Sequence, residues 1–99
     1  MLRLYRISGN SMLPTYRHND LVVAAARPFC RLVAGRVAIV ACAEPLLIIK
    51  RIKLLAANGD VVLASDNSAN QSRHCGVNIE NKRVLCLILY RLPRRMTWL

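Results

Sequence analysis

One lysine interrupts an apolar row near the middle of this chain. Residues 45–55 (PLLIIKRIKLL) predict a β-strand, whose side chains point alternately to the two faces of a sheet. Lys50 stands at the centre of one row, and the other members of that row are Leu46, Ile48, Ile52 and Leu54. Arg51 and Lys53 fall on the opposite face, where we expect them to point toward water. Because burying an ammonium group is costly, a buried lysine tends to give up its proton, and the neutral amine can act as a general base.

A serine that such a base could activate lies upstream in the sequence. Residues 9–15 (GNSMLPT) predict a tight turn that begins at a glycine and presents Ser11. A serine hydroxyl becomes nucleophilic when a nearby base accepts its proton, and a lysine can be that base. Ser11 and Lys50 together therefore predict a catalytic Ser–Lys dyad.

Short runs of strand-forming residues separated by turn residues predict a mainly β domain with hardly any helix. We expect a short extended piece at Ile79 and strands at 2–7, 21–25, 36–41, 45–55, 61–64 and 84–92. Asn58-Gly59-Asp60 is a strong hairpin pattern, and the polar segment 66–76 is predicted to be a loop. The chain has 99 residues with no linker or repeat, so residues 1–99 are expected to form one domain.

The chain is strongly basic, with 15 Lys and Arg residues against five Asp and Glu and a formal net charge of +10. Such a surface suits acidic partners, including nucleic acid, an anionic membrane or an acidic substrate. A compositional bias toward arginine explains the charge equally well. Residues 91–99 mix cations with apolar side chains, which fits either a weak contact with an anionic membrane surface or a frayed terminus.

The four cysteines, at positions 30, 42, 75 and 86, form no CxxC pair. We therefore expect four free thiols and no metal site. Cys42 and Cys86 lie in apolar runs and are expected to be small core residues. No apolar run is long enough to cross a bilayer, and the N-terminal residues do not follow a signal-peptide pattern, so the expected location is the cytoplasm.

Three segments resemble the characteristic boxes of the signal-peptidase/LexA-like superfamily of serine peptidases. Residues 8–15 (SGNSMLPT) with 19–23 (NDLVV) resemble the nucleophile box, and residues 49–52 (IKRI) resemble the lysine box. Residues 65–67 (SDN) with 72–77 (SRHCGV) resemble the third box, most closely that of the signal-peptidase branch. The resemblance implies an all-β fold of coiled antiparallel sheets and a serine endopeptidase that uses no metal or cofactor.

The resemblance also implies roles for residues around the nucleophile. Ser11 is expected to be the nucleophile and Lys50 the general base, while Met12 is expected to help shape the pocket. Some signal peptidases have a serine two positions before the nucleophile, where its hydroxyl helps to hold the oxyanion. Gly9 occupies that place here, so backbone N–H groups are expected to hold the oxyanion, with that of Ser11 the first candidate.

The third box supplies the predicted supporting residues. Asp66 is expected to brace the site, Ser72 to support it, and Arg73 to hold the loop near the lysine strand. This box departs from the family pattern in two places, because Ser65 stands where signal peptidases often have glycine and Gln71 where an acidic residue is common. The departures weaken the roles of Asp66 and Arg73 more than that of the dyad.

Ser11 lies close to the start of the printed sequence. We therefore expect neither the membrane anchor of an ordinary signal peptidase nor the DNA-binding domain of a self-cleaving LexA-type repressor. The expectation is a compact peptidase that acts in trans on a protein or peptide, such as the small proteases that trim the leader of nickel superoxide dismutase. Cys75-Gly76 is similar to a self-cleavage site, but we interpret it as structural. Neither the substrate nor the oligomeric state follows from the sequence.

Non-catalytic interpretations of the same residues stay open at this point. Ser11 alone could be a turn serine, Lys50 alone could extend to water from the edge of the core, and Asp66-Asn67 alone could be a plain turn. The main rival function is a non-catalytic basic β module that binds nucleic acid. The few aromatic residues form no stacking platform, so nucleic acid is not the expected partner. A degenerate peptidase-fold interaction domain is the third alternative, and the intact dyad argues against it.

Overall fold

The computed structural model of this chain describes residues 1–27, 31–42, 47–70 and 75–94. Its strands are β1 (Leu2–Arg6), β2 (Leu21–Ala26), β3 (Val37–Ala41), β4 (Leu47–Leu55), β5 (Val61–Ala64), β6 (Asn78–Ile79) and β7 (Val84–Arg91). The helical elements within these ranges are two short 3₁₀ turns, η1 (Ser68–Asn70) and η2 (Asn81–Arg83). The predicted mainly β fold is therefore confirmed.

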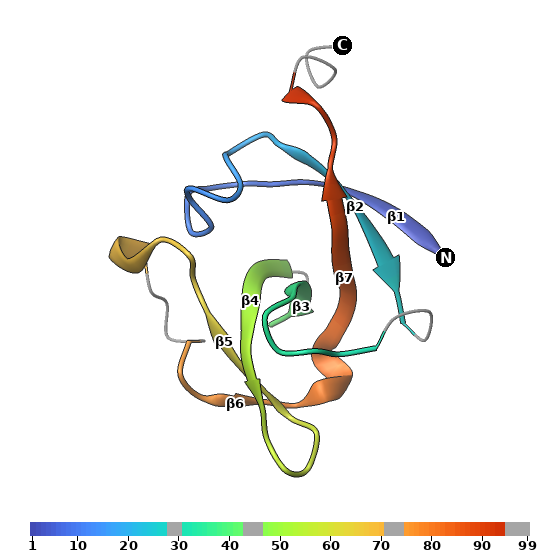
Figure 1. Cartoon of the computed structure of the whole chain (residues 1–99), viewed down its shortest axis with the longest axis vertical. Helices are drawn as coiled ribbons and strands as arrows, with labels where there is room; N and C mark the ends of the chain where they lie inside the picture. The colour runs from blue at the N-terminus through green and yellow to red at the C-terminus, as the bar shows by residue number, and fades with distance from the viewer. Residues whose placement is uncertain (28–30, 43–46, 71–74, 95–99) are drawn as a thin grey trace.

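The strands form one antiparallel sheet in the order β1-β2-β7-β3-β4-β5-β6. The sheet is strongly curled, so that β1, β2 and β7 lie on one side of the domain and β4, β5 and β6 on the other (Figure 1). Register shifts interrupt three of the ladders, including the one between Ile52 and Leu54 in β4. Such bulges bend a strand and increase its twist, which suits a sheet that coils on itself.

The curled sheet buries side chains from both of its faces. In β3, Val37 and Ile39 belong to one core cluster, whereas Ala38 and Val40 belong to a second. Successive side chains of a strand point to opposite faces, so the two clusters occupy the two sides of the same sheet. This double burial explains why β3 is apolar at every position rather than at alternate ones.

Strand β4 departs from the sequence prediction in two respects. Ile52 is fully buried as expected, but Leu54 is 44% exposed, because the register shift after Ile52 turns it out of the apolar row. On the opposite face Ile49 is buried and Arg51 is half-buried, since the curled sheet covers that face as well. The prediction that Arg51 points freely toward water is wrong. Leu46 lies outside the described residues.

Within the described residues no disulfide joins Cys42, Cys75 and Cys86, while Cys30 lies outside the described ranges. Cys86 is fully buried in the first core cluster, as predicted, and Cys42 is half-buried. Within the part of the chain that the structure describes, no helix is long and apolar enough to cross a membrane. In the same part, no three His, Cys, Asp or Glu side chains gather where they could hold a metal ion.

Candidate active site

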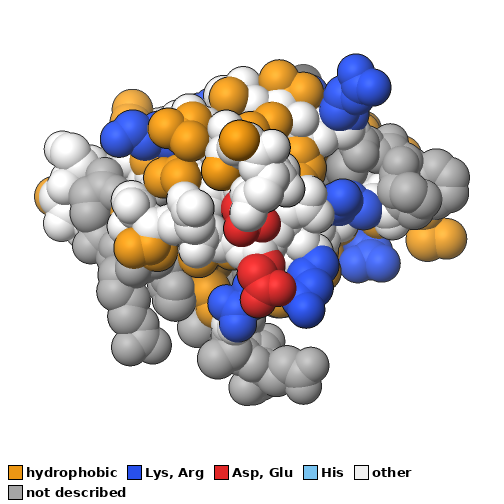
Figure 2. Space-filling model, turned by 90° about the horizontal axis from the view of Figure 1, so that it is seen from below, with side chains coloured by type: hydrophobic (Ala, Val, Ile, Leu, Met, Phe, Trp, Pro, Cys, Tyr) orange, Lys and Arg blue, Asp and Glu red, His pale blue; other side chains and the backbone are white. Residues whose placement is uncertain are grey.

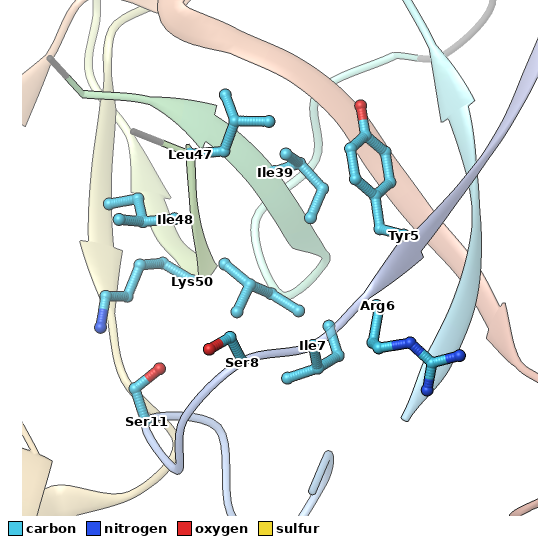
Figure 3. A pocket seen from close by; sticks show the side chains of 10 residues that line it. Tyr5, Arg6, Ile7, Ser8, Ser11, Ile39, Leu47, Ile48 and Lys50 are labelled. Carbon is cyan, nitrogen blue, oxygen red and sulfur yellow. The ribbon is translucent and has the colours of Figure 1, made fainter. Parts of the chain in front are cut away.

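Ser11 and Lys50 line the same pocket, which has a volume of about 310 Å³. Ser11 comes from the turn after β1 and Lys50 from the middle of β4. The other lining residues are Tyr5, Arg6, Ile7, Ser8, Ile39, Leu47, Ile48 and Ile49. The hydroxyl of Ser11 and the amine of Lys50 are directed toward the same space, with the hydroxyl of Ser8 beside them (Figure 3). The fold thus gathers the two residues of the predicted dyad at one cavity.

Lys50 is buried, with 4% of its surface exposed, and its amine is held by a serine. The Nζ atom donates a hydrogen bond of 2.7 Å to the Oγ atom of Ser65, which is itself 7% exposed. The Ser65 hydroxyl in turn donates to the carbonyl oxygen of Asn70 at 3.1 Å. Because its own proton is directed to Asn70, Ser65 presents a lone pair to the amine. Lys50 therefore has a fixed position at the pocket.

The pairing of β4 with β5 explains why Lys50 meets Ser65. In this ladder Arg51 lies opposite Ala64, so the next step along both strands brings Lys50 level with Ser65. Side chains at opposite positions of an antiparallel pair project from the same face, with their Cβ atoms about 5 Å apart. Ser65 follows the last paired residue of β5, where the chain leaves the sheet and enters the third-box loop. The contact is thus a consequence of strand register.

The third-box loop also holds the turn that carries Ser11. The backbone N–H of Asn67 donates to the carbonyl oxygen of Ser11 at 3.0 Å, and the Asn67 side-chain amide donates to the carbonyl oxygen of Asn10 at 3.0 Å. Inside the turn, the N–H of Leu13 donates to the same Asn10 carbonyl at 3.2 Å. The loop after β5 therefore positions both members of the candidate dyad.

Met12 and Gly9 support the turn from places outside the pocket lining. Met12 is 1% exposed and packs in the first core cluster, together with Ile7. It anchors the turn from inside the core and is not among the residues that line the pocket, so its part in shaping the pocket stays a prediction. Gly9 adopts a φ of +86°, which favours glycine, and its N–H donates to Nδ1 of His18 at 2.9 Å. Since this amide is already engaged, the Ser11 N–H stays the backbone candidate for oxyanion binding.

Asp66 joins β4 to the segment that follows Ser11. Arg51 binds it with two hydrogen bonds of 2.7 Å, from Nε to Oδ1 and from Nη2 to Oδ2. The hydroxyl of Thr15 donates to the second of these oxygens. The hydrogen bonds from Arg51 hold the pKa of Asp66 below its ordinary range, partial burial opposes this effect, and the bond from Thr15 adds to it. Paired hydrogen bonds between a guanidinium and a carboxylate are strong and directional, so they fix this junction.

Two predicted supporting residues, Ser72 and Arg73, lie outside the described ranges. Two polar residues at the site, Ser65 and Ser8, have no predicted role, since the sequence marks Ser65 only as a replacement for glycine. A register extended from the hairpin between β4 and β5 would have placed Asp66 rather than Ser65 opposite Lys50, because a shift between Ile52 and Leu54 changes the pairing by one residue. Ser8 gave no comparable pattern, because its direction depends on how the chain turns at Gly9.

A family model described as Peptidase S24-like matches residues 2–86, which include the Ser11 turn, the Lys50 strand and the third box. No curated protein matches the chain closely enough to be named as a relative. The match agrees with the resemblance to the signal-peptidase/LexA-like superfamily and with the curled antiparallel sheet. The family also includes non-catalytic members, so membership by itself establishes a peptidase-type fold. On the extent of this match, the chain belongs to the Peptidase S24-like family.

Proposed function

We propose that this chain is a serine endopeptidase that cleaves a protein substrate in trans, with Ser11 as nucleophile and Lys50 as general base. The position of Lys50 carries the proposal. A lysine that only borders a core extends its charged end into water. Lys50 is instead 4% exposed, is bound by Ser65 and points into the pocket that Ser11 lines.

The geometry supports a two-step acyl transfer. Lys50 accepts the proton of Ser11 while the hydroxyl oxygen attacks the substrate carbonyl carbon. The N–H of Ser11 donates to the oxyanion of the tetrahedral intermediate. Lys50 then gives its proton to the leaving amine, and water hydrolyses the acyl-enzyme with Lys50 again accepting a proton. Throughout, Ser65 accepts an N–H from the amine and keeps it facing Ser11.

The pocket supports an extended peptide as substrate. Apart from its polar residues, the lining consists of Tyr5, Ile7, Ile39, Leu47, Ile48 and Ile49, which would receive apolar side chains next to the scissile bond. The family resemblance favours small side chains immediately before the cut. We assign the substrate to the class of leader or propeptide segments of another protein, such as a maturing metalloenzyme, and place the reaction in the cytoplasm.

Cleavage in trans fits the position of Cys75-Gly76 better than self-cleavage does. The N–H of Gly76 donates to the carbonyl oxygen of Leu63 at 3.1 Å, and Cys75 forms an isolated bridge with the same residue. A peptide group engaged with β5 in this way is not presented to a nucleophile. The dipeptide is therefore a structural part of the loop, and the substrate comes from another chain.

Covalent labelling tests the dyad directly. Incubation with a serine-reactive fluorophosphonate probe, followed by intact-mass measurement and peptide mapping, should locate the adduct on Ser11. Ser11→Ala removes the site, and Lys50→Ala should abolish labelling although Ser11 is present. Ser68→Ala and Lys53→Ala are matched controls, because both residues are exposed and lie outside the pocket lining.

Digestion of a proteome-derived peptide mixture gives the second measurement. New termini should appear with the natural sequence and vanish with either dyad variant. Full cleavage by Ser11→Ala or Lys50→Ala would refute the assignment. Absence of labelling and cleavage, combined with a salt-sensitive gel shift that persists in Ser11→Ala, would instead support the nucleic-acid-binding module.

A further inference from the structure

A second pocket, remote from the dyad along β1, is lined by cations. It has a volume of about 380 Å³, and its walls consist of Arg3, Arg27, Asn81, Lys82, Val84 and Leu85. We propose that this basic pocket is an exosite for an acidic segment of the peptidase substrate. This inference rests on the proposed function, because the bound segment is a substrate only if the chain is a peptidase. The binding of an acidic peptide can nevertheless be measured without cleavage.

The charges of this pocket are available to a ligand. The Nη1 atom of Arg27 donates to the carbonyl oxygen of Asn81 at 2.8 Å and to its side-chain oxygen at 3.3 Å. These neutral acceptors orient the guanidinium without neutralising it. Lys82 lies 3.3 Å from Glu80, but both side chains are mostly exposed, so the pair is weak and can exchange for another carboxylate. No acidic residue belongs to the described lining.

Strand β1 connects the basic pocket with the candidate active site. Arg3 and Tyr5 project from the same face of β1, because they are two residues apart. Arg3 lines the basic pocket, whereas Tyr5 lines the pocket of Ser11 and Lys50. At about 3.3 Å per residue, the extended chain from Arg3 to Ser8 spans roughly 16 Å. A substrate that follows β1 from the dyad therefore reaches the basic pocket after about five residues.

The outer edge of β1 offers a route for such a substrate. β1 is the first strand of the sheet order, so it pairs on one side only, with β2. The carbonyl of Met1 and the N–H of Ile7 bond toward the β2 side of this ladder. In an antiparallel ladder alternate residues face the partner, so the backbone groups of Leu2, Leu4 and Arg6 point outward. An extended peptide can add to an edge of this kind through main-chain hydrogen bonds.

Charge favours carboxylates as the ligand chemistry. Arginine binds carboxylates through paired hydrogen bonds, and the pocket places two arginines and a lysine around one cavity. Basic side chains are spread over the face shown in Figure 2, whereas acidic ones occupy a small area of it. The net charge of +10 would attract an acidic segment from a distance. We infer that preferred substrates carry Asp or Glu about five residues from the scissile bond.

Binding is measured first, with cleavage blocked by Ser11→Ala. The probes are a fluorescein-labelled Glu-rich peptide and its Gln-substituted counterpart. Their binding is measured by fluorescence anisotropy at a fixed salt concentration. Arg3→Gln combined with Arg27→Gln should weaken binding of the Glu peptide about tenfold or more, since two charge-assisted contacts are lost. Arg17→Gln combined with Lys53→Gln is the matched control, because it removes the same charge from exposed positions outside both pockets. Equal weakening in the two double variants would overturn the exosite.

Cleavage specificity is measured next, on a peptide mixture with the active protein. Products should be enriched in Asp and Glu about five residues from the cut, and Arg3→Gln with Arg27→Gln should erase that enrichment while the dyad stays intact. Cleavage without acidic enrichment would overturn the exosite and leave the proposed function standing. Absence of cleavage together with selective binding of the Glu peptide would refute the peptidase and keep the pocket. The protein could instead bind an oligonucleotide through Arg3 and Arg27 and fail to bind the Glu peptide. That result would overturn the acidic peptide as the ligand and assign the pocket to nucleic acid.

Discussion

The amine of Lys50 lies 2.7 Å from the hydroxyl oxygen of Ser65, and both groups are buried. The hydroxyl of Ser65 donates its own proton to the Asn70 carbonyl, so it can only accept from the amine. A lysine side chain has four rotatable carbon–carbon bonds and would otherwise sample many positions. The hydrogen bond selects the one in which the amine faces the pocket of Ser11.

Replacing Ser65 tests this positioning. Ser65→Ala should lower kcat about 10- to 100-fold with little change in KM, because the base is misdirected while the substrate pocket is intact. The variant should also lose about 1–2 kcal/mol of unfolding free energy, since a buried donor loses its acceptor. Ser65→Thr keeps a hydroxyl and should restore most of the activity. Ser68→Ala serves as control, and an unchanged kcat in Ser65→Ala would contradict the role.

Replacing Lys50 by methionine separates catalysis from stability. Lys50→Met keeps an unbranched side chain of similar length but removes the amine, so cleavage and covalent labelling should disappear. Because the residue sits among Ile48, Ile52 and other apolar neighbours, the unfolding free energy should stay equal or rise by about 1–2 kcal/mol. Urea denaturation followed by circular dichroism measures it. A large loss of stability would show that the amine is a structural requirement of the core.

Asp66 predicts a dependence of stability on acidity. Its folded-state pKa is lowered, chiefly by hydrogen bonds from Arg51, so its contribution is present above the unfolded-state pKa and is lost as pH falls through the folded value. Asp66→Asn should therefore cost about 1–2 kcal/mol near pH 7, and the difference from the natural protein should shrink below about pH 4. Denaturation series at several pH values measure this. Glu80→Gln, at an exposed pair, should show almost no difference, and a pH-independent gap for Asp66→Asn would contradict the prediction.

The position of Ser8 leads us to expect that a second hydroxyl in the pocket contributes to catalysis. It lies beside Ser11 in the lining and stands three positions before it, next to the position where some signal peptidases have an oxyanion-binding serine. Since the N–H of Gly9 is engaged by His18, we expect the Ser8 hydroxyl to assist the Ser11 N–H at the oxyanion. Ser8→Ala should lower kcat about tenfold or more without preventing cleavage. Steady-state kinetics on a cleaved peptide would show it, and an effect confined to KM would assign Ser8 to substrate binding alone.

Strand positions were predictable because apolar alternation and turn residues are local features. The hairpin at Asn58-Gly59-Asp60 fixes β4 and β5, and the burial of Lys50 follows from its place in the apolar row. The apolar row and the glycine-started turn each suggested one half of a dyad, and the resemblance to known motifs supported the pairing of Ser11 with Lys50. Both residues do line one pocket.

The partner of Lys50 was not predictable, because it depends on one bulge. Near the hairpin Leu55 lies opposite Val61, and that register extended along the strands would bring Lys50 level with Asp66. The shift after Ile52 moves the pairing by one residue and brings Ser65 there instead. A one-residue shift changes which side chains share a face, and sequence patterns rarely locate it.

The prediction that Arg51 points toward water was wrong for a similar reason. Alternation correctly placed it on the face opposite Lys50, but the curl of the sheet, which covers that face, is a property of the whole fold. Asp66 could approach Arg51 only once β5 and its loop had packed beside β4.

Asn67 donates hydrogen bonds to the carbonyl groups of Asn10 and Ser11, although it lies more than fifty residues further along the chain. A ribosome-bound or half-folded molecule that has not yet closed this contact has no fixed oxyanion donor and no aligned hydroxyl. If the proposed mechanism holds, a chain in which this long-range contact is open would therefore be inactive.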